Sequence, residues 1–222
     1  MEYAIFPTAA DAPLAMSWES PLWQSTAAVE LANFHPAGSS HRPEVRAKLR
    51  YTPDALILRF AVRDRYVVCR HTRFQESVFK DSCVEFFLQP RCGRGYFNFE
   101  MNCGGTLLLY YIEDPTRTAD GFVRFTKVAP EHGRQVEILH TLPQVVDPEE
   151  PGPIDWEIGC KIPRGVLEAY TGALGTWAGQ VWRGNFYKCA DESSHPHWAS
   201  WAPIGERLDF HQPGCFAPVR FA

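Results

Sequence analysis

The stretch VRAKLRYTPDALILRFAV, residues 45–62, decides the fold class, because apolar and polar side chains alternate along most of it. Apolar residues occupy every second position in 45–51 and again in 56–62. A strand places every second side chain on one face, whereas a helix with 3.6 residues per turn does not. Thr52, Pro53 and Asp54, between the two halves, are typical turn residues. We therefore predict two antiparallel strands joined by a short turn.

The same alternation recurs along the rest of the chain, and only the short segment 163–170 has a helical pattern. Short strands separated by Pro, Gly and Asp turns, without an internal repeat, are typical of β-sandwiches. We predict an all-β fold: an antiparallel two-sheet sandwich of the immunoglobulin-like or jelly-roll type, with few short helices. Segments 36–43, 114–120 and 143–153 have the composition of loops, but none resembles a linker. We expect a single domain over residues 1–222.

Charge and hydropathy argue against two classes of partner. The net charge is −4, and the 22 basic residues are scattered along the chain, which argues against a surface that follows nucleic-acid phosphates. No apolar run is long enough to cross a membrane. We therefore expect neither nucleic acid nor a membrane as a partner.

The cysteines bear on the compartment of the protein. Seven are present, an odd number, and none forms a CxxC motif, so free thiols in a reducing compartment are the simpler interpretation. The N-terminal residues MEYAIFPTAADAP show no basic region followed by an apolar one, so no signal peptide is visible. Both observations favour a cytoplasmic location. An extracellular form whose leader has been removed stays open as an alternative.

The stretch WRGNFYKCADESSHPHWASWAP, residues 182–203, is the first candidate for a functional site, because it mixes aromatic and polar residues. If residues 181–189 form a strand, Arg183, Asn185 and Tyr187 share one of its faces. A guanidinium, an amide and a phenol on one face can together hold a polar ligand by hydrogen bonds.

A loop follows this strand and carries two tryptophans, Trp198 and Trp201. The run 193–197 contains Pro196, which removes a ladder hydrogen bond and so belongs outside a central strand. Planar aromatic rings beside hydrogen-bonding groups are typical of a site for a small polar ligand, above all a sugar. The alternative is that two buried tryptophans simply anchor a long loop to the fold.

Three segments carry a resemblance to a known family: VFKDSCVEFFLQP at 78–90, GYFNFEMNCGG at 95–105, and the tail over 184–221. They resemble the family 9 carbohydrate-binding modules, and most of all the family 9-like branch of stand-alone bacterial proteins. The resemblance covers nearly the whole chain. It implies an immunoglobulin-like or jelly-roll sandwich of the wider group that includes sugar- and haem-binding DOMON domains.

The resemblance implies a site in which two aromatic rings sandwich a terminal sugar ring. The family has a tryptophan six positions before the glutamate of a D-x-x-V-E segment; here that glutamate is Glu85, and Phe79 occupies the tryptophan position. The second family tryptophan matches Trp201, with Trp198 as the alternative. Phe79 can stack on a sugar, but it offers less area than tryptophan and no indole N–H.

The resemblance also implies roles for polar residues. Glu85 would accept hydrogen bonds from sugar hydroxyls, and Arg183 and Asn185 would donate them. Glu85 could instead be a structural carboxylate that binds backbone groups or Arg183. Calcium is possible as a structural ion, with Asp81 as a weak candidate ligand. We expect Asn98, Glu100 and Asn102 to form a solvated strand face.

The leading prediction is a non-catalytic protein of carbohydrate catabolism that binds a mono- or oligosaccharide and is functionally associated with glycoside hydrolases. One alternative is a hydrolytic enzyme that uses Glu85 and Glu100, which lie on adjacent predicted strands. Another is a metal-dependent enzyme that uses Cys189, His195 and His197. His211 could join a zinc site there, although the spacing of these residues matches no standard zinc motif.

Overall fold

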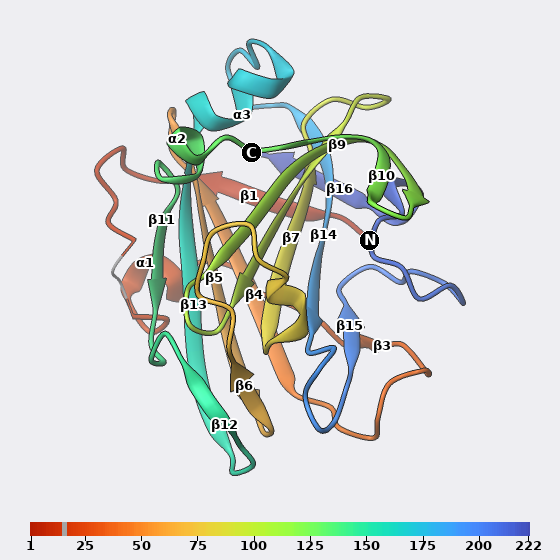
Figure 1. Ribbon diagram of the computed structural model, residues 1–222. Helices are drawn as coiled ribbons and strands as arrows, with labels where there is room; N and C mark the ends of the chain where they lie inside the picture. The colour runs from red at the N-terminus through yellow and green to blue at the C-terminus, as the bar shows by residue number, and fades with distance from the viewer. Residues whose placement is uncertain (15–16) are drawn as a thin grey trace.

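Two β-sheets pack face to face around one apolar core (Figure 1). The computed structural model of the protein describes residues 1–14 and 17–222. The first sheet contains, in spatial order, β10 (Gly121–Lys127), β9 (Leu107–Thr118), β8 (Tyr96–Asn102), β7 (Cys83–Gln89), β14 (Val181–Cys189) and β16 (Ala217–Phe221). The second contains β4 (Glu44–Tyr51), β5 (Ala55–Asp64), β13 (Ile154–Pro163) and β11 (Glu137–His140), with β2 (Val29–Glu30) beside β4.

Strand β1 (Tyr3–Pro7) connects the two sheets. Its first half pairs with β16, where Tyr3 lies opposite Val219, and its second half pairs with β4, where Phe6 lies opposite Arg50. Both pairings are parallel, whereas the other pairings among the described strands are antiparallel. The predicted all-β sandwich is therefore confirmed, and β1 is its one parallel element within the described residues.

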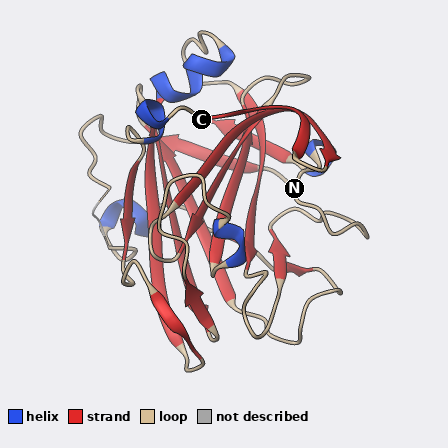
Figure 2. Ribbon diagram, viewed as in Figure 1, coloured by secondary structure: helices blue, strands red, loops and turns tan. Residues whose placement is uncertain are grey.

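Short elements surround the sandwich (Figure 2). They are β3 (Asn33–Phe34), β15 (Trp198–Ser200), the separate pair of β6 (Val67–Cys69) and β12 (Val146–Glu150), the helices α1 (Pro21–Gln24), α2 (Pro130–Gly133) and α3 (Arg164–Thr171), and the 3-10 turns η1 (Val78–Lys80) and η2 (Pro213–Cys215). The predicted helix at 163–170 corresponds to α3. None of the described helices is long and apolar enough to cross a membrane.

The hairpin predicted from residues 45–62 is present as β4 and β5. Tyr51 lies opposite Leu56, and Thr52 closes the turn because its hydroxyl oxygen accepts hydrogen bonds from the N–H groups of Asp54 and Ala55. The alternating apolar face packs into the core. The basic face is covered as well, because Lys48 Nζ donates to the carbonyl of Trp23. The N-terminal segment therefore shields the outer side of the second sheet.

The outer side of the first sheet is also covered, and the covering segments enclose the candidate functional site. A second apolar cluster lies on that side and joins Phe87 and Tyr187 of the sheet to Val78 of η1 and to Phe210. Phe210 belongs to residues 201–216, between β15 and β16, which we call the C-terminal segment. The alternation predicted for β14 holds, since Trp182 and Phe186 face the main core and Tyr187 faces the outer cluster. Segments distant in sequence therefore meet over the middle of β7, β8 and β14.

Candidate functional site

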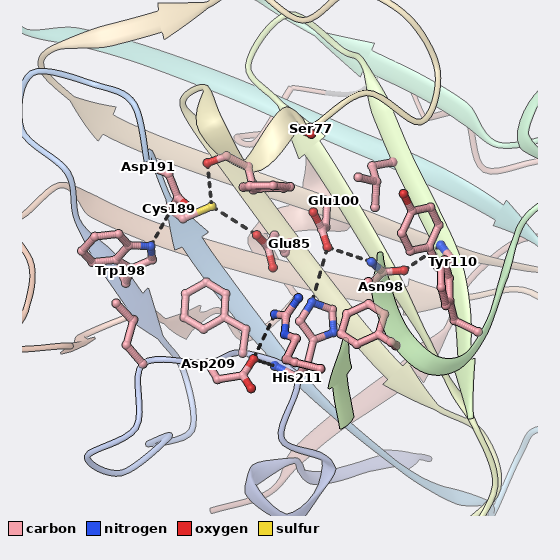
Figure 3. A pocket seen from close by; sticks show the side chains of 18 of the residues that line it. Ser77, Glu85, Asn98, Glu100, Tyr110, Cys189, Asp191, Trp198, Asp209 and His211 are labelled. Atoms are coloured by element: carbon pink, nitrogen blue, oxygen red, sulfur yellow. Dashed lines mark hydrogen bonds and ion pairs between the residues drawn. The ribbon is translucent and has the colours of Figure 1, made fainter. Parts of the chain in front are cut away.

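A cavity of about 430 Å³ opens on the outer side of the first sheet (Figure 3). Its lining comes from η1, β7, β8, β9, β10 and the end of β14. Asp191, Trp198 of β15 and residues 208–211 of the C-terminal segment complete it. Strands β7 and β8 lie at the base of the cavity. The η1 turn, the β9–β10 hairpin and the C-terminal segment form its walls. A volume of this size is typical of small-molecule sites in proteins.

Aromatic side chains form much of the wall. Phe79 on η1 and Trp198 at the start of β15 both line the cavity, and both are half-buried and pack against the outer cluster. The indole N–H of Trp198 donates a hydrogen bond of 2.7 Å to Asp191 Oδ1. Phe122 and Phe125 of β10 add further rings. The cavity therefore offers flat apolar surfaces to which the C–H face of a sugar can bind.

Two carboxylates form the floor of the cavity. Glu85 of β7 and Glu100 of β8 lie directly opposite each other across the two strands. Glu85 Oε1 accepts a hydrogen bond of 3.1 Å from the thiol of Cys189, and Glu100 Oε1 accepts one of 2.7 Å from Asn98 Nδ2. Figure 3 shows the pair between Cys189 on one side and Asn98 on the other. Glu85 is 3 % exposed and Glu100 is 4 % exposed.

Burial sets the protonation of this floor. It raises the pKa of Glu100 to about 8, and burial together with Cys189 and Glu100 raises the pKa of Glu85 well above its ordinary value. The floor at neutral pH therefore contains protonated carboxyl groups, which can donate as well as accept hydrogen bonds. Burial also raises the pKa of Asp191, which accepts the Trp198 indole.

The C-terminal segment closes the cavity with charged and imidazole groups. Asp209 pairs with Arg117 of β9 at 3.2 Å, and Arg117 also lies over the ring of Phe122. The His211 ring lies 2.9 Å from the Tyr96 hydroxyl through Nδ1 and 3.9 Å from Glu100 through Nε2. Burial lowers the pKa of His211 well below its ordinary value, so this imidazole is neutral at pH 7.

The structure places three of the six predicted ligand-binding residues at the cavity, namely Phe79, Glu85 and Trp198. Trp201 lies elsewhere. It is 6 % exposed and packs edge-to-face against Tyr3 and Phe186, with ring centres 6.2 and 5.7 Å apart. Of the two tryptophans in the loop, Trp198 faces the cavity and Trp201 belongs to the main core.

Arg183 and Asn185 also lie outside the cavity lining. Arg183 Nε donates to the carbonyl of Phe216 at 3.2 Å. The Asn185 amide both accepts from the N–H and donates to the carbonyl of Ala202, each at 2.9 Å. Both side chains therefore hold the C-terminal segment against β14, and that segment carries four cavity residues: Leu208, Asp209, Phe210 and His211.

One prediction about the strand faces was wrong. Asn98, Glu100 and Asn102 were expected on a solvated face, but they are 1 %, 4 % and 0 % exposed. The C-terminal segment and the β9–β10 hairpin cover Asn98 and Glu100, whereas Asn102 is covered by the turn that contains His71 and Asp81. Apolar residues on the same face, such as Tyr96 and Leu108, were the available signal that it is not solvated.

The residues considered for zinc do not converge. Cys189 and His211 line the cavity, His195 stacks on Tyr66 with ring centres 3.6 Å apart, and His197 lies in a separate buried cluster. The alternative of a metal-dependent enzyme that uses Cys189, His195 and His197 therefore has no common centre in the described residues.

The buried cluster around His197 contains an ammonium group of the protein itself. Potential ligand atoms of His41, Asp64 and His197 lie within 4.8 Å of one another. Lys188 Nζ lies 2.8 Å from His197 Nε2 and 3.3 Å from Asp64 Oδ2. The lysine therefore takes the place that a metal cation would need, and the cluster is an ion network that ties β5 to β14 and the loop before Trp198.

A second group of potential ligands contains Cys83, Glu85 and Cys189, also within 4.8 Å. Burial raises the pKa of Cys83 to about 12 and the pKa of Cys189 well above its ordinary value. Metal binding needs the thiolate form, which these surroundings disfavour. The Cys189 thiol acts instead as a hydrogen-bond donor to Glu85.

Asp81, the candidate calcium ligand, is surrounded by hydrogen-bond donors. Its Oδ2 accepts hydrogen bonds from the backbone N–H of His71 and from Asn102 Nδ2, each within 2.9 Å, and its Oδ1 lies 3.1 Å from His71 Nδ1. Calcium requires six to eight oxygen ligands. This donor set does not fit calcium, so Asp81 orders the turn before β7, and calcium binding stays a prediction of the resemblance alone.

The sequence model of carbohydrate-binding family 9 matches residues 14–221. The chain belongs to this family. A candidate carbohydrate-binding protein from Bacteroides uniformis shares 28 % identity, with a TM-score of 0.80 over 100 % of this chain and 97 % of that one. A search among curated protein sequences gave no match.

Two structures of a family 9 module from Caldicellulosiruptor kristjanssonii show the same fold. The complex with glucose has a TM-score of 0.59 at 11 % identity, over 99 % of this chain and 95 % of that one. The complex with cellotriose has a TM-score of 0.59 at 14 % identity, over 100 % and 93 %. The predicted family and fold are confirmed.

Membership of this family makes the protein a non-catalytic carbohydrate-binding protein. The hydrolytic alternative required Glu85 and Glu100 to act as a pair, and they are indeed neighbours. A glycosidase, however, needs one ionised and one protonated carboxyl group. Here burial raises both pKa values, so the environment does not divide the two roles.

Proposed function

We propose that the cavity between η1 and β15 is the carbohydrate site, and that it holds one terminal sugar ring against Phe79 and Trp198. The observation that carries the proposal is the juxtaposition of these rings with the floor of Glu85 and Glu100 in a single cavity. The C–H face of a pyranose is apolar, whereas its hydroxyl rim requires hydrogen-bond partners when water is removed. The cavity supplies both.

The hydroxyl rim would meet the floor of the cavity. Glu85 and Glu100 can accept hydrogen bonds in their ionised form and donate them when protonated. Asn98 is less available, since its amide already donates to Glu100 and its carbonyl oxygen accepts from the N–H of Tyr110 at 2.6 Å. We therefore assign to the two glutamates the contact with sugar that was predicted for Arg183 and Asn185.

A single ring limits the affinity. A hexose has about twelve heavy atoms, and at about −0.3 to −0.5 kcal/mol per atom its binding free energy is about −4 to −6 kcal/mol. This corresponds to dissociation constants from about 1 mM to tens of µM. Mono- and oligosaccharides would therefore bind weakly and exchange rapidly.

Calorimetric titration with a panel of mono- and oligosaccharides tests the proposal. Glucose, galactose, xylose, 2-amino-2-deoxyglucose, cellobiose and cellotriose would be titrated into the wild type and into Trp198→Ala. We expect at least one sugar to bind and Trp198→Ala to lose that binding. The absence of binding by every sugar, or equal binding by both proteins, would contradict the site.

We infer that residues 1–222 form one carbohydrate-binding domain, since a single core joins β1 near the N-terminus to β16 near the C-terminus.

We also propose that this protein serves carbohydrate catabolism in functional association with glycoside hydrolases, because a binding protein does not itself hydrolyse the sugar that it holds. Accelerated hydrolysis of an oligosaccharide by an added glycoside hydrolase in the presence of this protein would support the association, and an unchanged rate would count against it.

A further inference from the structure

We propose that the preferred ligand of the cavity is an amino sugar, a ring that carries a free ammonium group, which would sit between Glu85 and Glu100. This inference rests on the proposed function and names the class of sugar. It follows from three features of the cavity: the unused oxygens of its floor, the balance of charge on its lining, and the absence of a protein cation against the floor among the described residues.

The first feature is that each floor carboxylate keeps an oxygen for the ligand. Glu85 uses Oε1 for the Cys189 thiol, and Glu100 uses Oε1 for the amide of Asn98. Within residues 1–14 and 17–222, the second oxygen of each group has no hydrogen bond to the protein and is not enclosed by it. Both residues are more than nine-tenths buried, yet both have a free oxygen that reaches the cavity.

The second feature is an excess of negative groups on the lining. Among the described residues the carboxyl groups are Glu85, Glu100, Asp120, Asp191 and Asp209. The lysine and arginine side chains are Arg117 and Lys127. When its carboxyl groups ionise, the lining carries up to five negative charges against two positive ones, so it can balance a cationic ligand but not an anionic one.

The third feature is that neither cation neutralises the floor. Arg117 is held at 3.2 Å by Asp209 from the C-terminal segment, and it lies over Phe122 of β10. Lys127 of β10 lies over the ring of Tyr110. Lys80 of η1 is directed to Glu192, at 2.7 Å. Burial raises the pKa of Glu100 more than the charge of Arg117 lowers it. Among the described residues, none of these three cations forms an ion pair with Glu85 or Glu100.

Three uncharged titratable groups also surround the floor, namely His211, Cys189 and Tyr110. Burial lowers the pKa of His211 well below its ordinary value and raises the pKa of the Cys189 thiol and of the Tyr110 phenol. An unpaired ionised carboxylate is costly to bury, so the empty floor keeps its protons. An ammonium ion that enters would favour the ionised form and expel a proton to solvent.

This chemistry separates three kinds of sugar. An ammonium group has three N–H donors and can give one to the free oxygen of Glu85 and one to that of Glu100. An N-acetylated amine has no charge and gains only ordinary hydrogen bonds. The carboxylate of a uronic acid gains no ion pair with the floor and would repel each floor carboxyl group that ionises, so it is disfavoured.

Calorimetry at pH 6.5 in two buffers of different ionisation enthalpy tests the inference. The probes are 2-amino-2-deoxyglucose, its N-acetyl form, glucose and glucuronic acid. We expect the amino sugar to bind at least tenfold more tightly than glucose and to release up to about one proton. Glucose and the N-acetyl form should release none, and glucuronic acid should bind most weakly.

Two variants identify the group that is responsible. Glu100→Gln keeps the shape of the side chain and its hydrogen bond to Asn98. It should remove the preference for the amino sugar over glucose, so the ratio of the two affinities should fall to about one. Glu113→Gln is the matched control, because Glu113 is exposed on the neighbouring strand β9 and lies outside the lining. It should keep the preference. Thermal melting of both variants verifies that they are folded.

The outcomes distinguish this inference from the proposed function. If glucose binds as tightly as the amino sugar and Trp198→Ala abolishes both, the site stands and the amino-sugar inference is overturned. If the preference persists in Glu100→Gln, the ammonium does not bind at the floor, and the inference is likewise overturned. If none of the four probes binds and the wider sugar panel also fails, the proposed function itself is contradicted.

Discussion

The indole N–H of Trp198 donates a hydrogen bond of 2.7 Å to Asp191, seven residues earlier in the chain. Asp191 follows β14, and Trp198 begins β15, which pairs with β14 through Cys189. The hydrogen bond therefore closes the loop between the two strands and fixes the ring at the edge of the cavity.

Trp198→Ala should reduce sugar affinity without unfolding the protein. The side chain is half-buried at the cavity, so its removal deletes a stacking surface and leaves the main core intact. Loss of a central aromatic in so small a site should cost about 2 kcal/mol, or roughly thirtyfold in affinity. Titration with the best sugar of the panel measures the loss, and thermal melting should show a shift of a few degrees at most.

Trp201→Ala is the natural counterpart and should behave in the opposite way. Its ring is buried against Tyr3 and Phe186, so truncation should reduce the free energy of unfolding by about 3–5 kcal/mol. Below its melting temperature this variant should still bind sugar. If it stays stable but loses binding, Trp201 and not Trp198 contacts the ligand.

Asn185→Ala should destabilise the protein and spare its affinity. The Asn185 amide pairs with both backbone groups of Ala202, and its loss leaves them buried and unpaired at a cost of about 1–3 kcal/mol. Chemical denaturation measures this cost. Affinity measured well below the transition should change less than about twofold. A loss of binding in a fully folded variant would restore Asn185 as a ligand contact.

Phe79→Trp should hold or raise the affinity for sugar. Phe79 is half-buried on a short turn and lines the cavity, so a larger ring has room toward the ligand. The indole adds stacking area and an N–H donor. Titration and thermal melting of the variant check this. Weaker binding together with a lower melting temperature would mean that Phe79 is packed too tightly to be enlarged.

The sequence predicted the sandwich well because its strands have one apolar face each. Residues 45–62 illustrate this, since their period of two identifies both strands and the turn residues identify the hairpin. The hairpin of β9 and β10 was missed, because residues 114–120 are polar and were interpreted as a loop. An edge hairpin exposed to solvent lacks the apolar alternation that reveals a strand.

The sequence analysis named three residues of the candidate site, Phe79, Glu85 and Trp198, and it placed others there that lie outside the cavity. The choice between Trp198 and Trp201 depends on which face of β15 turns outward, and residues three apart in a strand lie on opposite faces. Sequence alone does not fix that rotation. The floor residue Glu100 was assigned to a solvated face, because its cover comes from residues more than a hundred positions later, such as Phe210 and His211.

The ion network behind Trp198 makes a prediction for stability in acid. Burial, and then the charge of Lys188, lower the pKa of His197 to about 3. Burial raises the pKa of Asp64, but Lys188 and the hydrogen bond from His41 outweigh it, so the pKa of Asp64 is lowered as well. Unfolding releases both groups to their ordinary values, near 6.5 and 3.8.

Between about pH 6.5 and pH 3, His197 is protonated in the unfolded chain but neutral in the folded protein. The contribution of His197 to stability is therefore complete above pH 6.5 and is lost progressively as the pH falls toward 3, at up to about 1.4 kcal/mol per pH unit. Asp64 adds a loss of the same sign below pH 3.8, and His211 acts in the same direction as His197. Glu85 and Glu100 have the opposite sign, because their raised pKa values cost stability as the pH rises above 4.5.

These groups titrate over overlapping ranges of pH. The difference in the free energy of unfolding between wild type and His197→Gln therefore isolates the contribution of the histidine. A glutamine oxygen can still accept the hydrogen bond from Lys188, but it does not titrate. Urea denaturation at pH 7.5, 6, 5 and 4 should show the wild type losing stability relative to the variant at each step below 6.5. At pH 7.5 the variant should have a lower free energy of unfolding than the wild type, because glutamine does not reproduce the packing of the neutral imidazole. The difference between the two free energies should shrink as the pH falls. A gap that stays constant from pH 7.5 to 4 would mean that His197 has an ordinary pKa and that Lys188 does not depend on a neutral imidazole.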